Sequence, residues 1–310
     1  MAGNHILIIG GGAIGMPVAR HFCANHEVTV IKRSPLSMAD ENSGIDIHPV
    51  TVEPVIKVAD IQNRDALSNA LPEKIDYALV CVSPSRYTED AYRLTFVQGV
   101  NNLVMALHHR GITPKRVFFV SSTSVYHQDD GSEVDENSVI QPESFAGQHL
   151  KTAESLLTDS SLATTCVRFS GIYGGNRSRL INQVATGNAE LSASNHFTNR
   201  IHESDCIRAL CHLMQLAMDG KNLEDIYLAT DSEPVRINTI LQWLAARLKS
   251  PELIRNKHRP DYEQEMNKKN RRRPGSKRCS NRRLLATGFR FVYPTYKEGY
   301  TEMLGRFKAP

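Results

Sequence analysis

Short apolar runs alternate with amphipathic stretches along the first 170 residues of the chain. The runs are rich in branched residues and bounded by polar or glycine positions, which is typical of buried strands. Between them, apolar residues recur every three or four positions, as on one face of a helix. The predicted strands are His5–Gly10, Glu27–Lys32, Val55–Val58, Ile75–Val82, Val117–Ser121 and Ala163–Phe169, and the predicted helices are Ile14–Cys23, Arg64–Leu71, Arg86–Arg110 and Gly147–Thr158.

This alternation predicts an α/β fold, a doubly wound parallel Rossmann sheet. After Ser170 the texture changes: glycine and asparagine are frequent and the helical patterns are interrupted. We expect a smaller C-terminal substrate lobe, interwoven with the end of the Rossmann sheet. Residues 1–172, with about 201–230, would form the dinucleotide-binding domain, and about 173–200 with 231–310 the substrate lobe. In this second part the pattern predicts helices Ser204–Met218 and Ile237–Leu248 and a strand Ile226–Ala229.

Composition places the chain among ordinary globular proteins, with 310 residues, 41% hydrophobic and 23% charged. No apolar run approaches the roughly 18 residues of a membrane span, and no signal peptide precedes the first strand. We therefore expect a cytoplasmic protein with no membrane contact. The six cysteines include no Cys-x-x-Cys pair, which favours reduced thiols and predicts no metal site.

The net charge of +4 is unevenly distributed, because residues 255–283 carry 12 Lys and Arg against 3 Asp and Glu. Such a run could neutralise several nucleic-acid phosphates. It lacks aromatic residues for base stacking, apart from Tyr262, so nucleic-acid binding is not favoured. A solvated or anion-facing surface is the better interpretation.

The glycine-rich segment after the first strand fits the pattern G-x-G-x-x-G, with Gly10, Gly12 and Gly15 around Ala13 and Ile14. The first glycine permits a tight turn, the second lets backbone N–H groups approach a pyrophosphate, and the third allows close helix packing. The N-terminus of the following helix adds a partial positive charge. The segment therefore predicts a dinucleotide-binding loop.

The end of the second strand indicates which dinucleotide binds. An acidic residue there would accept hydrogen bonds from the ribose 2′-OH of NAD, but this chain carries Lys32, Arg33 and Ser34. These residues can donate charge-assisted hydrogen bonds to a 2′-phosphate. The predicted cofactor is NADP(H), with NAD(H) as the alternative. An ordinary solvated strand end would also explain the two basic residues.

Three later motifs occur in a fixed order: SSTSVY at 121–126, RFSGIYG at 168–174 and NRIHESD at 199–205. Together with the glycine loop they resemble the extended, and in part atypical, short-chain dehydrogenase/reductases, specifically the NAD-dependent epimerase/dehydratase group. The tail, with KRCSN at 277–281 and YPTY at 293–296, is similar to the bacterial YeeZ-like branch. The resemblance spans nearly the whole chain.

The resemblance implies further cofactor contacts. Asp60, after the third strand, corresponds to the acidic residue that meets the adenine amino group. Ser83 ends the fourth strand, where a small residue lets the cofactor cross the sheet. Ser121, Ser170 and Ile172 correspond to positions beside the cofactor, the last two near its nicotinamide.

For catalysis, the resemblance places Ser122 at the family's catalytic Ser/Thr position, with Thr123 next to it and Tyr126 as a candidate substitute acid. Arg200 and His202 correspond to positions facing the substrate. Arg200 could bind an anionic group, or it could pair with Glu203 or Asp205.

The chain departs from the pattern of this family at the catalytic pair. The family's reaction uses a Tyr-x-x-x-Lys pair on the helix after the fifth strand, eight and four residues before an Ala-Glu glutamate. Counting back from Glu154 gives Ala146 and Leu150. His127, His149 and Lys151 are further candidates for the missing roles. The Tyr293–Lys297 spacing lies too far along the chain to replace the pair.

Two functions remain. The first is an NADP(H)-dependent oxidoreductase or epimerase-like enzyme acting on a carbonyl or sugar-type small molecule with an altered acid/base. The second is a non-catalytic NADP(H)-binding sensor or regulator. Loss of the pair favours the second, and the retained Ser122 favours the first. The sequence leaves the oligomeric state open, with a homodimer as one candidate.

Overall fold

A computed structural model describes residues 3–35, 52–250 and 275–307 of the chain. Most of the loop expected between Ser34 and Pro54 lies outside these residues, as does most of the basic segment 255–283. The chain divides into two compact, interleaved units. The first contains Met1–Val125, Ile140–Arg168 and Cys206–Tyr227, and the second Tyr126–Val139, Phe169–Asp205 and Leu228–Pro310.

The first unit is built on a seven-stranded sheet in the order β11-β7-β5-β4-β1-β2-β3. The pairs β3–β2, β2–β1, β1–β4 and β4–β5 are parallel. The strands are β1 (His5–Ile9), β2 (Glu27–Lys32), β3 (Val55–Val58), β4 (Tyr77–Val80), β5 (Arg116–Ser122), β7 (Thr164–Phe169) and β11 (Ile226–Ala229).

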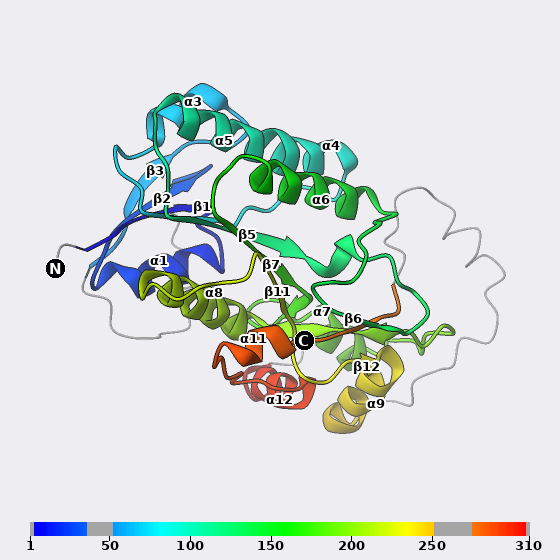
Figure 1. Ribbon diagram of the computed structural model, residues 1–310. Helices are drawn as coiled ribbons and strands as arrows, with labels where there is room; N and C mark the ends of the chain where they lie inside the picture. Colours follow the sequence, from blue (N-terminus) through cyan, green and yellow to red (C-terminus); the bar gives the residue numbers. More distant parts are fainter. Residues whose placement is uncertain (1–2, 36–51, 251–274, 308–310) are drawn as a thin grey trace. The chain divides into compact units, whose positions relative to one another are not determined.

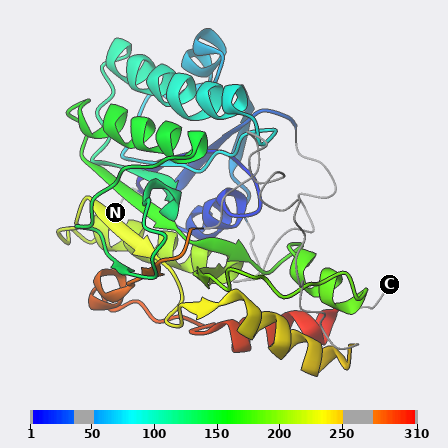
Figure 2. The same cartoon turned by 90° about the vertical axis from the view of Figure 1, so that its right-hand side faces the viewer.

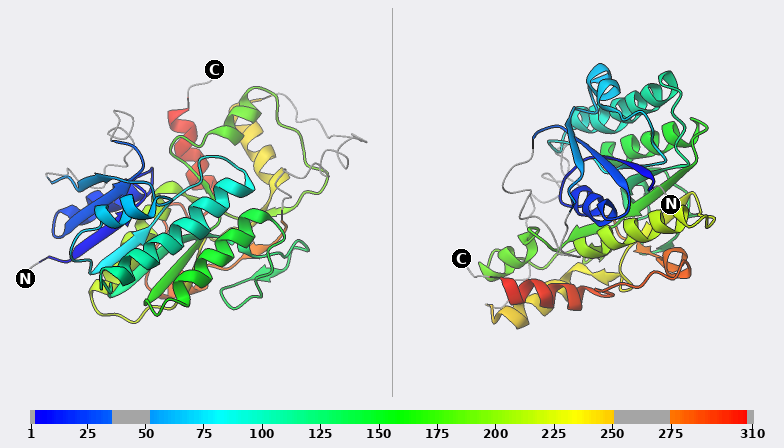
Figure 3. Two further views of the ribbon diagram at one scale, coloured as in Figure 1. Left: turned by 90° about the horizontal axis from the view of Figure 1, so that it is seen from above. Right: turned by 90° about the vertical axis from the view of Figure 1, so that its left-hand side faces the viewer.

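Helices cover both faces of this sheet (Figures 1 and 2), with α3, α4, α5 and α6 over one face and α1 and α8 over the other. Figure 3 shows α5 and α6 side by side. Their bounds are α1 (Gly15–Cys23), α3 (Arg64–Ala70), α4 (Glu89–Tyr92), α5 (Gly99–His109), α6 (Phe145–Thr158) and α8 (Glu203–Met218).

The strand order reverses between β1 and β4. The connection after β1 leads to β2 on one side of this point, and the connection after β4 leads to β5 on the other side. In open α/β sheets, ligands bind outside the carboxyl ends of the strands at such a switch point. Strands β1 and β4 are almost entirely buried and β5 has no exposed residue, as expected for central strands covered on both faces. The predicted doubly wound Rossmann fold is confirmed.

The second unit consists of short paired strands and a helical cluster. Its strand pairs are β8–β10, β9–β12 and β6–β13. Tyr173 and Tyr300 lie in its apolar core, and the rings of Trp243 and Tyr296 bring α9 and α12 together at 5.7 Å between centroids. The elements are β6 (Glu133–Val134), β8 (Gly171–Tyr173), α7 (Arg179–Ala185), β9 (Phe197–Thr198), β10 (Arg200–His202), β12 (Val235–Arg236), α9 (Ile237–Leu248), β13 (Arg278–Cys279), α11 (Arg282–Ala286) and α12 (Tyr296–Arg306).

The second unit takes three separate segments of the chain, in agreement with an interwoven C-terminal lobe. The segment Tyr126–Val139, assigned to the Rossmann domain by sequence, belongs to this unit because β6 pairs with β13. The assignment of dinucleotide binding to one part of the chain and of substrate binding to the other stays a prediction. In the described part of the chain, no helix combines the length and apolar character needed to cross a membrane.

Candidate cofactor and active site

The glycine loop joins β1 to α1 in the first unit, and its backbone geometry requires glycine at two positions. Gly10 has φ +106°, and a Cβ there would overlap the carbonyl oxygen of Cys81 at the end of β4. A Cβ at Gly15 would overlap the carbonyl oxygen of Gly10. The loop is held to the sheet by the Gly10 N–H, which donates to the Ile31 carbonyl at 2.8 Å. The tight turn and the close helix packing are therefore both present.

Gly12 differs from these two glycines because it is exposed. No heavy atom lies within 4 Å of a Cβ built on it, so space is open above the loop. The N-cap position of α1 is Ile14, which has no side-chain acceptor for the first N–H groups. Ala13 is half-buried beside it. A helix N-terminus without a capping side chain, next to open space, suits a pyrophosphate.

The predicted determinants of cofactor choice follow the ends of β2 and β3. Lys32 is half-buried, and Arg33 and Ser34 are exposed. The parallel register pairs Lys32 with Val58, so Asp60, two residues further on, lies at the same edge of the sheet. One Asp60 carboxylate oxygen accepts the Gln62 N–H at 3.0 Å.

Ser83 follows β4 and Ser121 lies near the carboxyl end of β5, but their surroundings differ. Ser83 is exposed. Ser121 is buried, and its hydroxyl donates to the Glu154 carboxylate on α6 at 2.6 Å. The Ser121 hydroxyl is therefore already engaged within the protein. Its predicted contact with the cofactor stays a prediction.

Glu154 is also the partner of a buried arginine. Nε and Nη2 of Arg168, on β7, donate to the two carboxylate oxygens of Glu154 at 2.9 and 2.6 Å. Both side chains are buried, Arg168 with 1% of its surface exposed and Glu154 with 6%. This bidentate geometry satisfies both charges in a site that water does not reach. The first residue of the RFSGIYG motif is thus a structural anchor for α6.

The predicted catalytic residues Ser122 and Thr123 lie where β5 ends and a short 3-10 turn, η2 (Thr123–Val125), begins. Ser122 is half-buried, and its hydroxyl oxygen accepts the Ser124 N–H at 3.2 Å. Thr123 is 8% exposed. Helix α6 packs tightly on this turn, because a Cβ at Gly147 would overlap the Ser124 carbonyl oxygen.

The positions where the resemblance expects tyrosine and lysine are packed into the protein. Ala146 is 3% exposed and Leu150 is 4% exposed, both on α6. Lys151 does not replace the missing lysine in this structure, because its Nζ donates to the Ile140 carbonyl at 3.1 Å. His149 is half-buried, and burial lowers its pKa below the ordinary histidine value. Within the described residues, its Nε2 has no hydrogen-bond partner.

The other predicted residues belong to the second unit. Tyr126 is 3% exposed, and its carbonyl accepts a hydrogen bond from Lys277 Nζ at 3.1 Å. His127 is exposed. Ser170 is buried, and its N–H donates to the Ala229 carbonyl at 3.1 Å. Ile172, on β8, pairs with Ile201 of β10.

Arg200, on β10, is buried to 9% exposure and donates to the Thr198 hydroxyl at 2.6 Å. The two acidic residues considered as its ion-pair partners are engaged elsewhere: Glu203 pairs with Arg177, and the Asp205 carboxylate accepts the N–H groups of Val292 and Tyr293.

The positive charge of Arg200 instead influences the pKa of a different acid, Asp231. Burial raises the Asp231 pKa to about 8, and the positive charge of Arg200 works against this rise.

His202, also on β10, lies in an aromatic environment and is 1% exposed. The ring of Tyr293 lies 4.0 Å from its own between centroids. Its Nδ1 accepts the Ser204 N–H at 3.3 Å, and its Nε2 is 3.6 Å from the Glu302 carboxylate. Burial lowers the His202 pKa to about 4, so the neutral ring dominates at pH 7. These contacts show a packed histidine, and its predicted role toward substrate stays a prediction.

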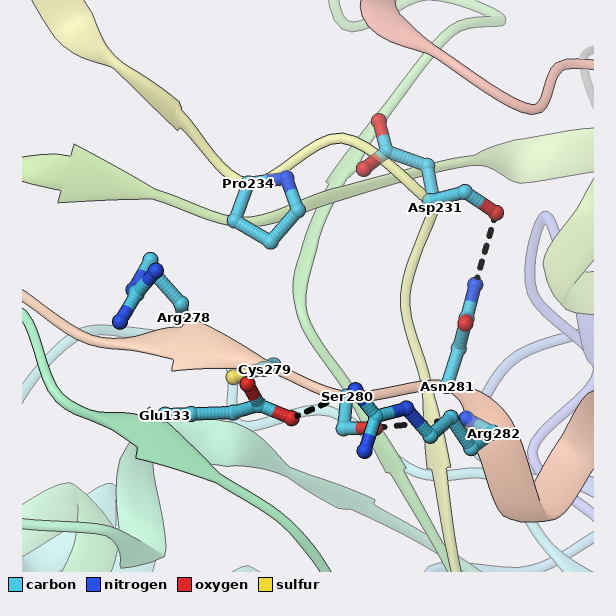
Figure 4. A pocket seen from close by; sticks show the side chains of 9 residues that line it. Glu133, Asp231, Pro234, Arg278, Cys279, Ser280, Asn281 and Arg282 are labelled. Atoms are coloured by element: carbon cyan, nitrogen blue, oxygen red, sulfur yellow. Dashed lines mark hydrogen bonds and ion pairs between the residues drawn. The ribbon is translucent and has the colours of Figure 1, made fainter.

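The second unit also contains a pocket of about 300 Å³ that the sequence did not predict. Figure 4 shows Glu133 and the charged Arg282 on one side of it and Pro234 on another. Two further lining residues are joined by a hydrogen bond, which Asn281 donates to the Ser232 hydroxyl at 3.0 Å. Its lining comes from β6, from β13 and the residues that follow it, and from the residues after β11. These segments lie far apart in the sequence, so no local pattern predicts the pocket. The lining residues are Glu133, Asp231, Ser232, Pro234, Arg278, Cys279, Ser280, Asn281 and Arg282.

Comparisons with known proteins agree with this architecture. A protein from Methylobacillus flagellatus, given as an NAD-dependent epimerase/dehydratase, is 31% identical over 99% of both chains, with a TM-score of 0.76. WbmG from Bordetella bronchiseptica in complex with NAD is 16% identical over 98% of this chain and 93% of that one (TM-score 0.73). DesIV, a dTDP-glucose 4,6-dehydratase from Streptomyces venezuelae, is 17% identical over 98% and 99% (TM-score 0.74). At this identity the last two show a shared fold.

A search of curated protein sequences finds no match. The profile of the NAD dependent epimerase/dehydratase family matches residues 6–229, well over half of the chain. This range runs from β1 through β11 and includes the glycine loop, both ends of the Arg168–Glu154 pair, and α6. The chain belongs to the NAD-dependent epimerase/dehydratase family.

Proposed function

We propose that this protein binds a nicotinamide dinucleotide across the switch point of its sheet and uses it in oxidoreductase or epimerase chemistry on a carbonyl or sugar-type substrate. The glycine loop is the observation that carries the proposal. Gly10 and Gly15 hold a turn that other residues cannot adopt, and open space lies above Gly12. The bound dinucleotide would supply the hydride acceptor or donor.

NADP(H) is the proposed preferred cofactor. The support is the basic end of β2, where Lys32 and Arg33 stand in place of the acidic residue that holds an NAD ribose. NAD(H) is the alternative, since the solved structures of WbmG and DesIV contain NAD. Calorimetric titration with NADPH and NADH decides between them. Equal affinities would remove the support for NADP(H).

The proposed substrate is a small molecule with a secondary alcohol or carbonyl. The support is family membership and the similarity to MoeE5, which was solved with UDP-glucose and NAD and is 20% identical to this chain. Ser122, at the carboxyl end of β5, is proposed to orient the reacting oxygen, with Thr123 beside it. Arg200, His202, Ser170 and Ile172 remain the proposed contacts from the second unit.

A non-catalytic, cofactor-sensing role is the second candidate. It is favoured by one observation, the burial of Ala146 and Leu150 at the positions of the family's acid/base pair. An activity assay distinguishes the two functions. The protein is loaded with NADPH or NADP⁺ and tested with sugar nucleotides and simple carbonyl compounds. Saturable cofactor binding without turnover over the whole panel supports the sensor, and turnover supports the enzyme.

A further inference from the structure

An aromatic cluster in the first unit brings a tyrosine to the start of α6. The ring of Tyr87 lies 4.9 Å from that of Phe145, the first residue of α6, and 5.5 Å from that of Tyr92 on α4. Tyr92 contacts Phe145 in turn at 5.4 Å. Tyr87 keeps 37% of its surface exposed, so packing leaves part of this side chain accessible.

The cluster lies at the carboxyl edge of the sheet. Tyr87 belongs to the connection that leaves the carboxyl end of β4, between β1 and β5 in the sheet order. This connection begins at Cys81, whose carbonyl packs against Gly10 of the glycine loop. Figure 1 shows α4 and α6 beginning on the side toward which the strands of this sheet point.

Helix α6 fixes the other side of this arrangement. Its first turn packs on η2, the turn that directly follows Ser122, because Gly147 approaches the Ser124 carbonyl closely. Phe145, which contacts Tyr87, therefore precedes Ala146 in the first turn of the helix that packs on η2. Two separate connections thus tie Tyr87 to the carboxyl edge of the sheet: the chain that begins at Cys81 beside Gly10, and the ring contact with Phe145 of α6.

Other groups at this edge are poorly suited to transfer a proton. Ala146 and Leu150 have no titratable group, and Lys151 is held by the Ile140 carbonyl. His149 of α6 is half-buried, and because burial lowers its pKa, the neutral ring is favoured, which can accept a proton but is a poor donor. Tyr126 is only 3% exposed. Serine and threonine hydroxyls are too weakly acidic near neutral pH. We propose that Tyr87 is the catalytic proton donor and acceptor of this protein, an inference that rests on the proposed function.

In the oxidative direction, the bound dinucleotide would accept a hydride from the carbinol carbon of the substrate, whose C–O single bond would become C=O. The Tyr87 phenolate would accept the hydroxyl proton and become the neutral phenol. In the reductive direction, the reduced cofactor would return the hydride to the carbonyl carbon, and the Tyr87 phenol would donate its proton to the oxygen. Each direction balances in atoms and electrons with the dinucleotide as the only co-reactant.

The test uses the full-length protein labelled with ¹³C at the tyrosine ζ-carbon, whose resonance reports on the phenol and its electrostatic environment. Tyr87→Phe assigns the Tyr87 signal and keeps the ring contact with Phe145. Calorimetry first establishes which of NADP⁺ and NAD⁺ binds more tightly. Spectra are then recorded with the oxidised cofactor, with the reduced cofactor, and with the matching ADP-ribose that lacks the nicotinamide ring.

We expect the oxidised cofactor to produce its largest shift, among the 10 tyrosines of the chain, at Tyr87. The reduced cofactor should shift it differently because the nicotinamide ring then carries no positive charge, and the ring-free fragment should leave it in place. Tyr92, an aromatic member of the same cluster, is the control and should respond little to all three.

A Tyr87 signal that stays fixed at saturating cofactor, or that responds equally to the ring-free fragment, overturns the proposal while leaving the proposed function intact. Absence of saturable binding in the calorimeter overturns the proposed function itself. The two failures are therefore distinguishable in one series of measurements.

Discussion

The glycine loop and helix α6 lie on the same sheet, yet they differ in how they treat the family's functional positions. In the loop, Gly10 and Gly15 have a steric reason to be glycine, and Gly12 keeps open space above the chain. In α6, Ala146 and Leu150 are buried and apolar. The apparatus for binding a dinucleotide is present, whereas the usual residues for proton transfer are replaced by packing. Binding and proton transfer can therefore be changed independently on this fold.

The largest effect is expected from removing the anchor of α6. Glu154→Gln leaves the buried Arg168 guanidinium without its counter-charge, and breaking a buried pair typically costs about 3–5 kcal/mol of unfolding free energy. Urea denaturation measures this loss. Asp90→Asn is the control, because Asp90 and Arg93 form an exposed pair at 2.8 Å with 71% and 51% side-chain exposure, and its effect should stay below about 1 kcal/mol. Equal effects of the two variants would show that α6 is not held by this pair.

The next effect concerns the loop. Gly12→Val should weaken NADPH binding at least about 100-fold, roughly 2.7 kcal/mol, and should leave the unfolding midpoint nearly unchanged. The reason is that the new side chain meets no protein atom within 4 Å of its Cβ but fills the space proposed for the pyrophosphate. Gly305→Val, at another unobstructed glycine on α12, is the matched control and should bind normally. Normal binding by the Gly12 variant would mean that the phosphates lie elsewhere.

A smaller effect is expected at the end of β2. Arg33→Asp should reduce the ratio of NADPH to NADH affinity by at least about tenfold, or about 1.4 kcal/mol, because a carboxylate repels the 2′-phosphate and accepts from a 2′-OH. Fluorescence titration with both cofactors measures the ratio. An unchanged ratio would assign Arg33 to the solvated surface, where it is exposed in the structure.

The smallest effect on cofactor affinity is expected at Lys151, on helix α6. Lys151→Met should change NADPH affinity by less than about twofold, under about 0.5 kcal/mol, because the Lys151 ammonium is bound to the Ile140 carbonyl. The same titration measures the affinity. Lys115→Met is the control, because Lys115 lies just before the amino end of β5, where its Nζ is 3.3 Å from the Asp76 carboxylate. A tenfold loss specific to Lys151 would show that this lysine moves to hold the cofactor.

Much of the first unit could be predicted because its signals are local. Strands β2 and β3 were predicted at their observed bounds, and β1 within one residue, since each is a short run rich in branched residues next to polar or glycine positions. The helix predicted over residues 86–110 is interrupted by a π-helical segment, η1 (Arg93–Gln98), just before Gly99. A side chain at Gly99 would press on Ile61, a contact from the connection after β3 that periodicity cannot reveal.

The second unit was harder to predict. Its strands have two or three residues, and pairs such as β6–β13 join segments more than 140 residues apart. Helix α12 did carry a usable signal, the capping box of Thr295 and Glu298, which the sequence interpretation did not use.

At the candidate site the same division holds. The glycine loop is readable because its turn, helix and strand are adjacent in sequence. Arg168 was quoted within a motif but received no role, because its partner Glu154 lies on another element. Tyr87 carries no motif at all, and only its ring contact with Phe145 draws attention to it.

The measurement that tests the central claim most directly is a crystal structure with NADPH or NADP⁺ bound. It should place the pyrophosphate against the backbone N–H groups at the start of α1, above Gly12, and the adenosine 2′-phosphate near Lys32 and Arg33. No side chain of α6 should lie within hydrogen-bonding distance, about 3.2 Å, of the reacting atoms. A pyrophosphate away from the glycine loop, or Lys151 on the nicotinamide ribose, would contradict the account.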